Sequence, residues 1–257
     1  MPQPDTLLQR LDHIGSSLEQ KEGALALLGV GSVGQELDRM DEYSDLDFFV
    51  IVESGAKQRF IDRLDWLEDV LPLEYCFKNT DDGYKFLYQD GIYGEFAVFE
   101  EGELKHIPYK AARVVWRSPK AAHFIIGDNN AERIPSIRKD QLDYSLNEAL
   151  TNLYVGLGRY ARGEKLSAMR FVQGYAIDSI LSVLHLLEEE EDYYPDPFGN
   201  ERRLERRFPK FGALIGEMML GYNRTPESAL NILSYLERVY PVNGRLSEEI
   251  RKLARTV

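Results

Sequence analysis

The most informative segment for the class of fold is ALALLGVGSVGQELDRMDEYSDLDFFVIV (24–52). It opens on a short apolar run (24–30) of the length of a buried strand. It closes on DLDFFVIV (45–52), whose β-branched and aromatic residues predict a second strand. Side chains alternate along a strand, so Asp45 and Asp47 are expected on the same face. If the two strands are antiparallel neighbours, the polar loop between them returns the chain so that Gly31 and Ser32 lie beside this acidic pair.

These four residues suit the binding of a metal and a phosphate together. Two carboxylates directed to one side attract divalent cations, and Mg²⁺ prefers hard oxygen ligands while keeping waters and substrate phosphates in its shell. Gly31 lets a backbone approach a phosphate, and Ser32 adds a hydroxyl and an N–H donor. An isolated Asp-x-Asp is an ordinary solvated strand start. Its spacing of twelve residues from Gly-Ser makes the chemical interpretation stronger.

The chain around this stretch has the pattern of mixed helices and strands. Apolar residues at helical spacing predict helices over 5–20, capped by Asp5 or Thr6, and over 57–71. The Asp81-Asp82-Gly83 turn predicts a hairpin of strands 73–78 and 85–89. Further strands are expected over 92–99 and over 123–128.

After residue 138 the pattern is helical only. We expect helices over 140–162, 166–191, 201–221, 225–240 and 246–256. The predicted class is α+β: a mixed-sheet domain over 1–135 and a C-terminal helical bundle over 136–257.

Composition excludes several classes of protein. The net charge of −12 disfavours a nucleic-acid partner, because a polyphosphate would be repelled. No apolar run has the ~18–20 residues of a membrane span, and the first residues lack the features of a signal peptide. The one cysteine, Cys76, rules out an internal disulfide and fits the cytoplasm; we expect it to be a small core residue. The four histidines have no metal-ligand spacing, so structural or surface roles are expected for them.

The Gly-Ser, loop, Asp-Leu-Asp pattern resembles the signature of the DNA polymerase β-like nucleotidyltransferase superfamily. Within it, residues 31–52 are similar to antibiotic nucleotidyltransferases for lincosamides and kanamycin. Residues 65–108 resemble the lincosamide enzymes of the linB type, above all in Gly-Glu-Phe at 94–96. NLYVGLGRYARGEKLS (152–167) is a further similarity. One departure is Gln35-Glu36, which stands where a basic residue is often found.

The resemblance implies a nucleotidyltransferase fold and site. Asp45 and Asp47 would bind two Mg²⁺ ions, Gly31 and Ser32 would hold the β- and γ-phosphates of ATP or another NTP, and Glu95 would be the third carboxylate, as metal ligand or general base. Gly94 would leave room for substrate or metal. The acceptor would be a small hydroxylated molecule, such as a lincosamide or aminoglycoside antibiotic, and the protein a homodimer.

Several alternatives stay open at this stage. By alternation alone, Glu95 is an exposed strand residue. Arg162, Lys165 and Arg170 could reach triphosphate oxygens or form an ordinary basic helix end. The chain could also be a degenerate nucleotide-binding or antitoxin-like regulator, or a transferase acting on a tRNA end or a protein side chain, although the net charge disfavours tRNA.

Overall fold

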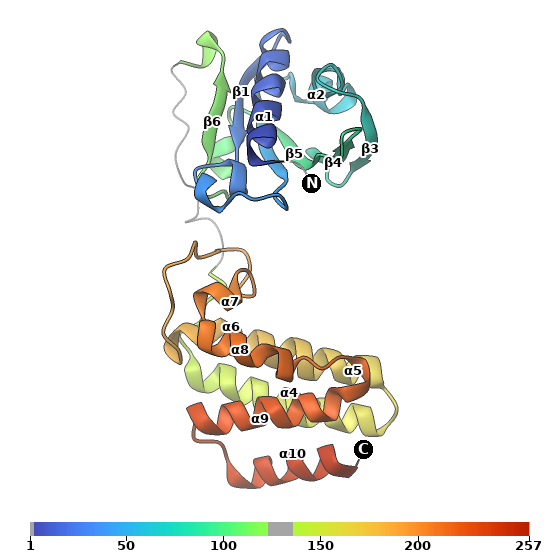
Figure 1. Cartoon of the computed structure of the whole chain (residues 1–257), viewed down its shortest axis with the longest axis vertical. Helices are drawn as coiled ribbons and strands as arrows, with labels where there is room; N and C mark the ends of the chain where they lie inside the picture. The colour runs from blue at the N-terminus through green and yellow to red at the C-terminus, as the bar shows by residue number, and fades with distance from the viewer. Residues whose placement is uncertain (1–2, 123–135, 257) are drawn as a thin grey trace. The chain divides into compact units, whose positions relative to one another are not determined.

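The computed structural model describes residues 3–122 and 136–256. The chain divides into two compact units, Met1–Pro135 and Ser136–Val257 (Figure 1). The assignment of a separate role to each unit stays a prediction. The strand expected over 123–128 lies outside the described residues.

A mixed six-stranded sheet forms the centre of the first unit. Its strands are β1 (Ala24–Gly29), β2 (Leu46–Val52), β3 (Leu73–Lys78), β4 (Gly83–Tyr88), β5 (Tyr93–Glu100) and β6 (Arg113–Arg117). The order across the sheet is β3-β4-β5-β2-β1-β6. β2 and β5 are parallel, and every other neighbouring pair is antiparallel. The α+β class is therefore confirmed. β6 was not predicted from the sequence.

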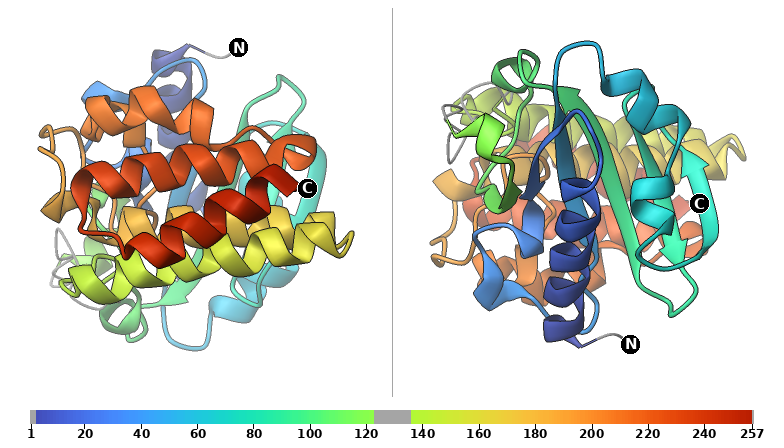
Figure 2. Two further views of the ribbon diagram at one scale, coloured as in Figure 1. Left: turned by 90° about the horizontal axis from the view of Figure 1, so that it is seen from below. Right: turned by 90° about the horizontal axis from the view of Figure 1, so that it is seen from above.

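Helices cover one face of the sheet (Figure 2). α1 (Pro4–Glu19) places Leu7, Leu11, Ile14 and Leu18 against it, and all four are fully buried. They pack with residues that alternate along the strands, such as Phe48, Phe96 and Phe86. Burying a side chain of this size contributes roughly 1.5–3 kcal/mol to stability. The packing on this face therefore holds the strands in place, and their opposite face is left to carry polar residues. The expected caps are wrong: α1 begins at Pro4, and Gln3 occupies the N-cap.

The helix predicted over 57–71 is two shorter helices, α2 (Lys57–Asp62) and α3 (Asp65–Glu68). Arg63 between them is extended, with φ −131° and ψ 112°. The break lets Trp66 turn into the core, where it is fully buried and its indole N–H donates to the Phe60 carbonyl at 3.1 Å. Tertiary packing of a large aromatic residue thus overrides the continuous helical period.

The opposite sheet face is covered in part by the segment after β5. Leu104, Tyr109, Ala112 and Ala121 pack there with Phe99 of β5 and with residues of β1 and β2. Asp47, Glu95 and Lys85 belong to this second face, because they alternate with the buried Phe48, Phe96 and Phe86.

The second unit is helical, as predicted. Its elements are α4 (Leu142–Ala161), α5 (Lys165–Met169), a π-helical turn (Arg170–Tyr175), α6 (Ala176–Val183), α7 (Leu204–Arg207), α8 (Pro209–Met218), α9 (Thr225–Val239) and α10 (Gly244–Thr256). α4, α9 and α10 pack side by side (Figure 2). Two predicted boundaries are wrong. The helix expected to reach 191 gives way to a 3₁₀ turn at Leu184–Leu186, and the one expected over 201–221 is interrupted at Phe208.

A buried ion pair ties the loop after α6 to α7. Arg207 is 1 % exposed and donates to Glu190 Oε1 from Nε at 2.9 Å and from Nη2 at 2.7 Å. Glu190 also accepts from Arg138 at 2.7 Å. Among the helices of 3–122 and 136–256, none has the length and apolar character to cross a membrane.

Candidate functional site

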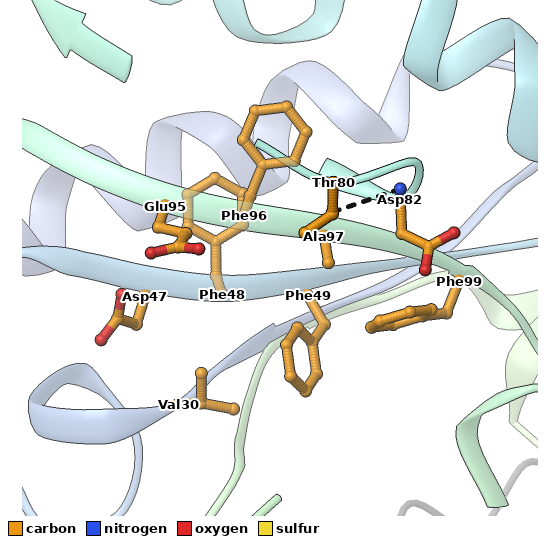
Figure 3. Close-up of a pocket in the computed structure, with 10 residues that line it drawn as sticks. All are labelled: Val30, Asp47, Phe48, Phe49, Thr80, Asp82, Glu95, Phe96, Ala97 and Phe99. Carbon is orange, nitrogen blue, oxygen red and sulfur yellow. Dashed lines mark hydrogen bonds between the residues drawn. The ribbon is translucent and has the colours of Figure 1, made fainter. Parts of the chain in front are cut away.

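Asp47 and Glu95 lie side by side on the second sheet face. β2 and β5 are parallel neighbours, and their register pairs these two residues directly. Both line a cavity of about 300 Å³, together with apolar residues such as Val30, Phe49 and Ala97 (Figure 3). This register could not be predicted from the sequence, because two helices and a hairpin lie between β2 and β5 in the chain.

Gly31 meets Asp47 at close range, as the predicted antiparallel pairing of β1 and β2 requires. The Val30 N–H donates to the Asp47 carbonyl at 2.8 Å, and the chain then turns through a 3₁₀ turn, Gly31–Val33. Gly31 has φ +61°, and a Cβ there would lie 3.0 Å from Asp47 Oδ2. Glycine is therefore required twice, for its backbone angle and for its missing side chain. Ser32 is buried in the same turn.

Two side chains that we did not predict hold the Glu95 carboxylate. Asn79 Nδ2 donates to Glu95 Oε1 at 2.7 Å, and Lys85 Nζ forms an ion pair with Glu95 Oε2 at 3.3 Å. The hydrogen bond to Glu95 raises the pKa of Lys85. Both partners hold the Glu95 carboxylate in one direction.

A sequence signal existed for the hairpin of β4 and β5, but it did not specify Lys85 as the partner of Glu95. Asp-Gly is a strong hairpin signal, and Asp90-Gly91 lies between β4 and β5. A two-residue Asp90-Gly91 turn would pair Glu95 with Phe86, whereas the observed register pairs Glu95 with Lys85 across a three-residue loop, Gln89–Gly91. Asn79 lies in the β3–β4 connection, where no sequence signal indicated a contact with Glu95.

Asp45 has a different position from Asp47. It lies one residue before β2 begins and lines a second cavity of about 710 Å³, with Tyr43, Asp90 and Tyr93 among its neighbours. Within the described ranges, no three His, Cys, Asp or Glu side chains form a group that could hold a metal. The structure thus brings Asp47 and Glu95 together, and the complete three-carboxylate set stays a prediction.

The loop between β1 and β2 is tied to the segment before β6. Gln35 Nε2 donates to the Ala112 carbonyl at 2.9 Å, and Glu36 pairs with Arg39 at 2.9 Å and with Lys110 at 3.3 Å. Gln35-Glu36, the departure from the antibiotic enzymes, is therefore a structural anchor of this loop.

The role predicted for Gly94 is wrong. A Cβ at Gly94 would lie 2.5 Å from Phe86 Cζ and 2.8 Å from the Leu46 carbonyl oxygen. Its missing side chain makes room for the aromatic core on the helix-covered face, and not for substrate or metal beside Glu95.

The core position predicted for Cys76 is also wrong. Cys76 is exposed, because β3 is the last strand at its edge of the sheet.

The basic residues considered for triphosphate binding belong to the second unit. Arg162 pairs with Glu164 at 3.1 Å, Lys165 lies over the Tyr160 ring, and Arg170 lies over the Tyr175 ring. These contacts are those of a basic helix end, and a phosphate role for the three stays a prediction.

The chain is similar to several solved structures. An aminoglycoside 6-adenyltransferase from Bacillus subtilis matches at 15 % identity and a TM-score of 0.38, over 97 % of each chain. The Thermotoga maritima CCA-adding enzyme complexed with tRNA matches at 14 % identity and a TM-score of 0.40, over 99 % of this chain and 73 % of that one. A STING-associated CdnE c-di-GMP synthase from Capnocytophaga granulosa matches at 10 % identity and a TM-score of 0.30, over 98 % of this chain and 79 % of that one. No protein-family model and no curated protein matches the chain.

Proposed function

We propose that the chain is a nucleotidyltransferase that moves a nucleoside monophosphate, AMP from ATP in the first instance, onto a hydroxyl of a small molecule with release of pyrophosphate. The observation that carries the proposal is the close approach of Gly31 to Asp47, with Glu95 in register beside it. A tight glycine turn against two carboxylates suits a triphosphate bound through a divalent cation.

The turn after β1 would bind the β- and γ-phosphates. Gly31 presents its backbone without a Cβ, and Ser32 follows in the same 3₁₀ turn. Backbone N–H groups in such turns form concave anion sites. Positioning of the triphosphate by this turn would align the α-phosphorus for in-line attack and so supply much of the rate enhancement.

Asp45 and Asp47 would hold two Mg²⁺ ions, with the Glu95 carboxylate beside them. The fit rests on the donor chemistry and on the shared cavity wall of Asp47 and Glu95, which offers hard carboxylate oxygens from adjoining strands. When bound, Mg²⁺ neutralises charge on the phosphate oxygens and lowers the pKa of a coordinated hydroxyl.

Glu95 is the residue that we propose as general base. Asn79 and Lys85 fix its carboxylate, and Glu95 would accept the proton of the attacking hydroxyl at Oε2 as Lys85 turns away. Proton abstraction by a positioned side chain contributes about 10²–10⁴-fold to a rate. The apolar residues of the cavity, such as Val30 and Phe99, would pack against the acceptor, for which a lincosamide or an aminoglycoside is the first candidate.

A second candidate function is nucleotide binding without turnover. It is favoured by one observation: Asn79 and Lys85 engage both Glu95 oxygens, which are then committed to protein contacts. A regulator would need no free third carboxylate.

Pyrophosphate release across NTPs and hydroxylated antibiotics, with mass spectrometry of the product, tests the proposal. We expect Mg²⁺- or Mn²⁺-dependent release and loss of turnover by orders of magnitude in Asp45→Asn and Asp47→Asn, because each removes a charge from the metal site. Asp12→Asn is the matched control, since it makes the same change at an exposed position of α1. Nucleotide binding with no product from any acceptor would favour the regulator, and near-wild-type rates in the Asp47 variant would refute the metal site.

A further inference from the structure

β3 is an edge strand. Its side chains are exposed on both faces of the sheet, and one row of its backbone groups faces away from β4. Among the described residues it pairs with β4 alone and stands last in the sheet order. Every residue from Glu74 to Lys78 is exposed. Tyr75 and Phe77 are the largest of them, with 54 % and 52 % of their surface accessible. Such an edge is a ready template for another strand unless charge or shape prevents pairing.

The sequence of β3 is complementary to itself. Glu74-Tyr75-Cys76-Phe77-Lys78, paired antiparallel with a second copy and centred on Cys76, sets Glu74 opposite Lys78 and Tyr75 opposite Phe77. By symmetry each of these pairs occurs twice. Opposite charges and aromatic rings directly across an antiparallel pair are both stabilising.

The other edge of the sheet has the reverse property. β6 has the sequence Arg-Val-Val-Trp-Arg. An antiparallel pair of two β6 strands centred on Val115 would set Arg113 of one copy opposite Arg117 of the other. Like charges directly opposite each other are destabilising. Charge therefore distinguishes the two edges and selects β3 for self-association.

We propose that β3 of one copy pairs antiparallel with β3 of a second copy, in the register centred on Cys76. The two-fold axis of such a pair is perpendicular to the sheet, so two sheets join into one and keep corresponding faces on the same side. Tyr75 and Phe77 share a face with Lys85 and Glu95, because Phe77 pairs with Lys85 and Lys85 with Glu95. The joined aromatic residues thus continue the face that carries the candidate site. The pairing does not depend on nucleotidyl transfer.

The test is a charge-swap series measured by sedimentation velocity over a range of concentrations. Wild type should dimerise. Glu74→Lys and Lys78→Glu should each weaken the dimer about tenfold or more in Kd, because two symmetric attractive pairs become repulsive. The double variant E74K/K78E restores opposite charges in the same register and should return the Kd to near that of wild type. Glu19→Lys, the same charge change at an exposed residue of α1, should leave the dimer intact.

Cys76 gives the register directly, since it is the only cysteine of the chain. A short bis-maleimide should cross-link wild type and the double variant, because directly opposed Cβ atoms lie roughly 5 Å apart and the two thiols are then within its reach. Cross-linking should fall in each single charge variant and be lost in Cys76→Ser, which should still dimerise. A monomer at every concentration, a dimer indifferent to both single substitutions, or a double variant that stays monomeric would each overturn the proposal. Circular dichroism melts check that the variants are folded.

Discussion

Replacing Gly31 by alanine tests the contact on which the proposed site depends. Gly31 has φ +61°, and the new Cβ would lie 3.0 Å from Asp47 Oδ2, closer than ordinary van der Waals contact. The substitution therefore strains the backbone and also pushes the Asp47 carboxylate away from its place beside Glu95. Gly55→Ala is the matched control, because Gly55 has φ +80° and open space within 4 Å of its Cβ position.

The two effects have different magnitudes. A left-handed conformation costs a non-glycine residue about 1–2 kcal/mol, and both variants should lose this stability. At about 2–4 °C per kcal/mol, each should melt roughly 2–8 °C below wild type. Only Gly31→Ala displaces a carboxylate of the candidate site. A misplacement of about 1 Å can cost on the order of 10²-fold in rate, so we expect turnover to fall by about that factor relative to Gly55→Ala.

Thermal melting, titration calorimetry with Mg²⁺ and a non-hydrolysable ATP analogue, and pyrophosphate release form the assay. Weaker metal-nucleotide binding and slower turnover should appear in Gly31→Ala alone. If the two variants match in nucleotide affinity and rate, the contact between Gly31 and Asp47 has no functional role, and the proposed importance of this contact is refuted.

Three further outcomes are expected. Glu95→Gln should lower kcat by about 10²–10⁴-fold with nearly unchanged nucleotide KM; rescue by excess Mg²⁺ would instead make Glu95 a metal ligand. Arg207→Met should cost about 1.5–3 kcal/mol in urea unfolding, because it removes two hydrogen bonds to the Glu190 carboxylate and leaves Arg138 as its partner; a loss below about 1 kcal/mol would contradict this. The Arg59 guanidinium lowers the pKa of Asp65 from 3.8 to about 2. Asp65 therefore stabilises the fold above its unfolded pKa, and this stability is lost as pH falls through about 2. Asp65→Asn should lose only about 1 kcal/mol near pH 7, since 40 % of the side chain is exposed to solvent, and the difference from wild type should vanish in unfolding curves near pH 2.

The local sequence pattern was sufficient to predict most of the helices and strands, and also the Gly31–Asp47 part of the candidate site. The apolar runs of β1 and β2, the Asp81-Asp82-Gly83 hairpin and the helical period of α1 each depend on residues close together in the sequence. Gly31 and Asp47 were predictable for the same reason, since one loop joins their strands. The break between α2 and α3 was not predictable, because it depends on Trp66 finding space in a core built by distant strands.

The class of fold, the change from mixed to helical pattern near residue 138, and the meeting of a glycine turn with an acidic strand start can therefore be inferred from the sequence. The parallel register that sets Glu95 beside Asp47, the contacts of Asn79 and Lys85 with Glu95, and the exposure of Cys76 on an edge strand depend on the folded chain. The physical reason is that strand order and register are fixed by which faces bury together. That choice is made by the whole core, whereas local spacing specifies only where each strand begins.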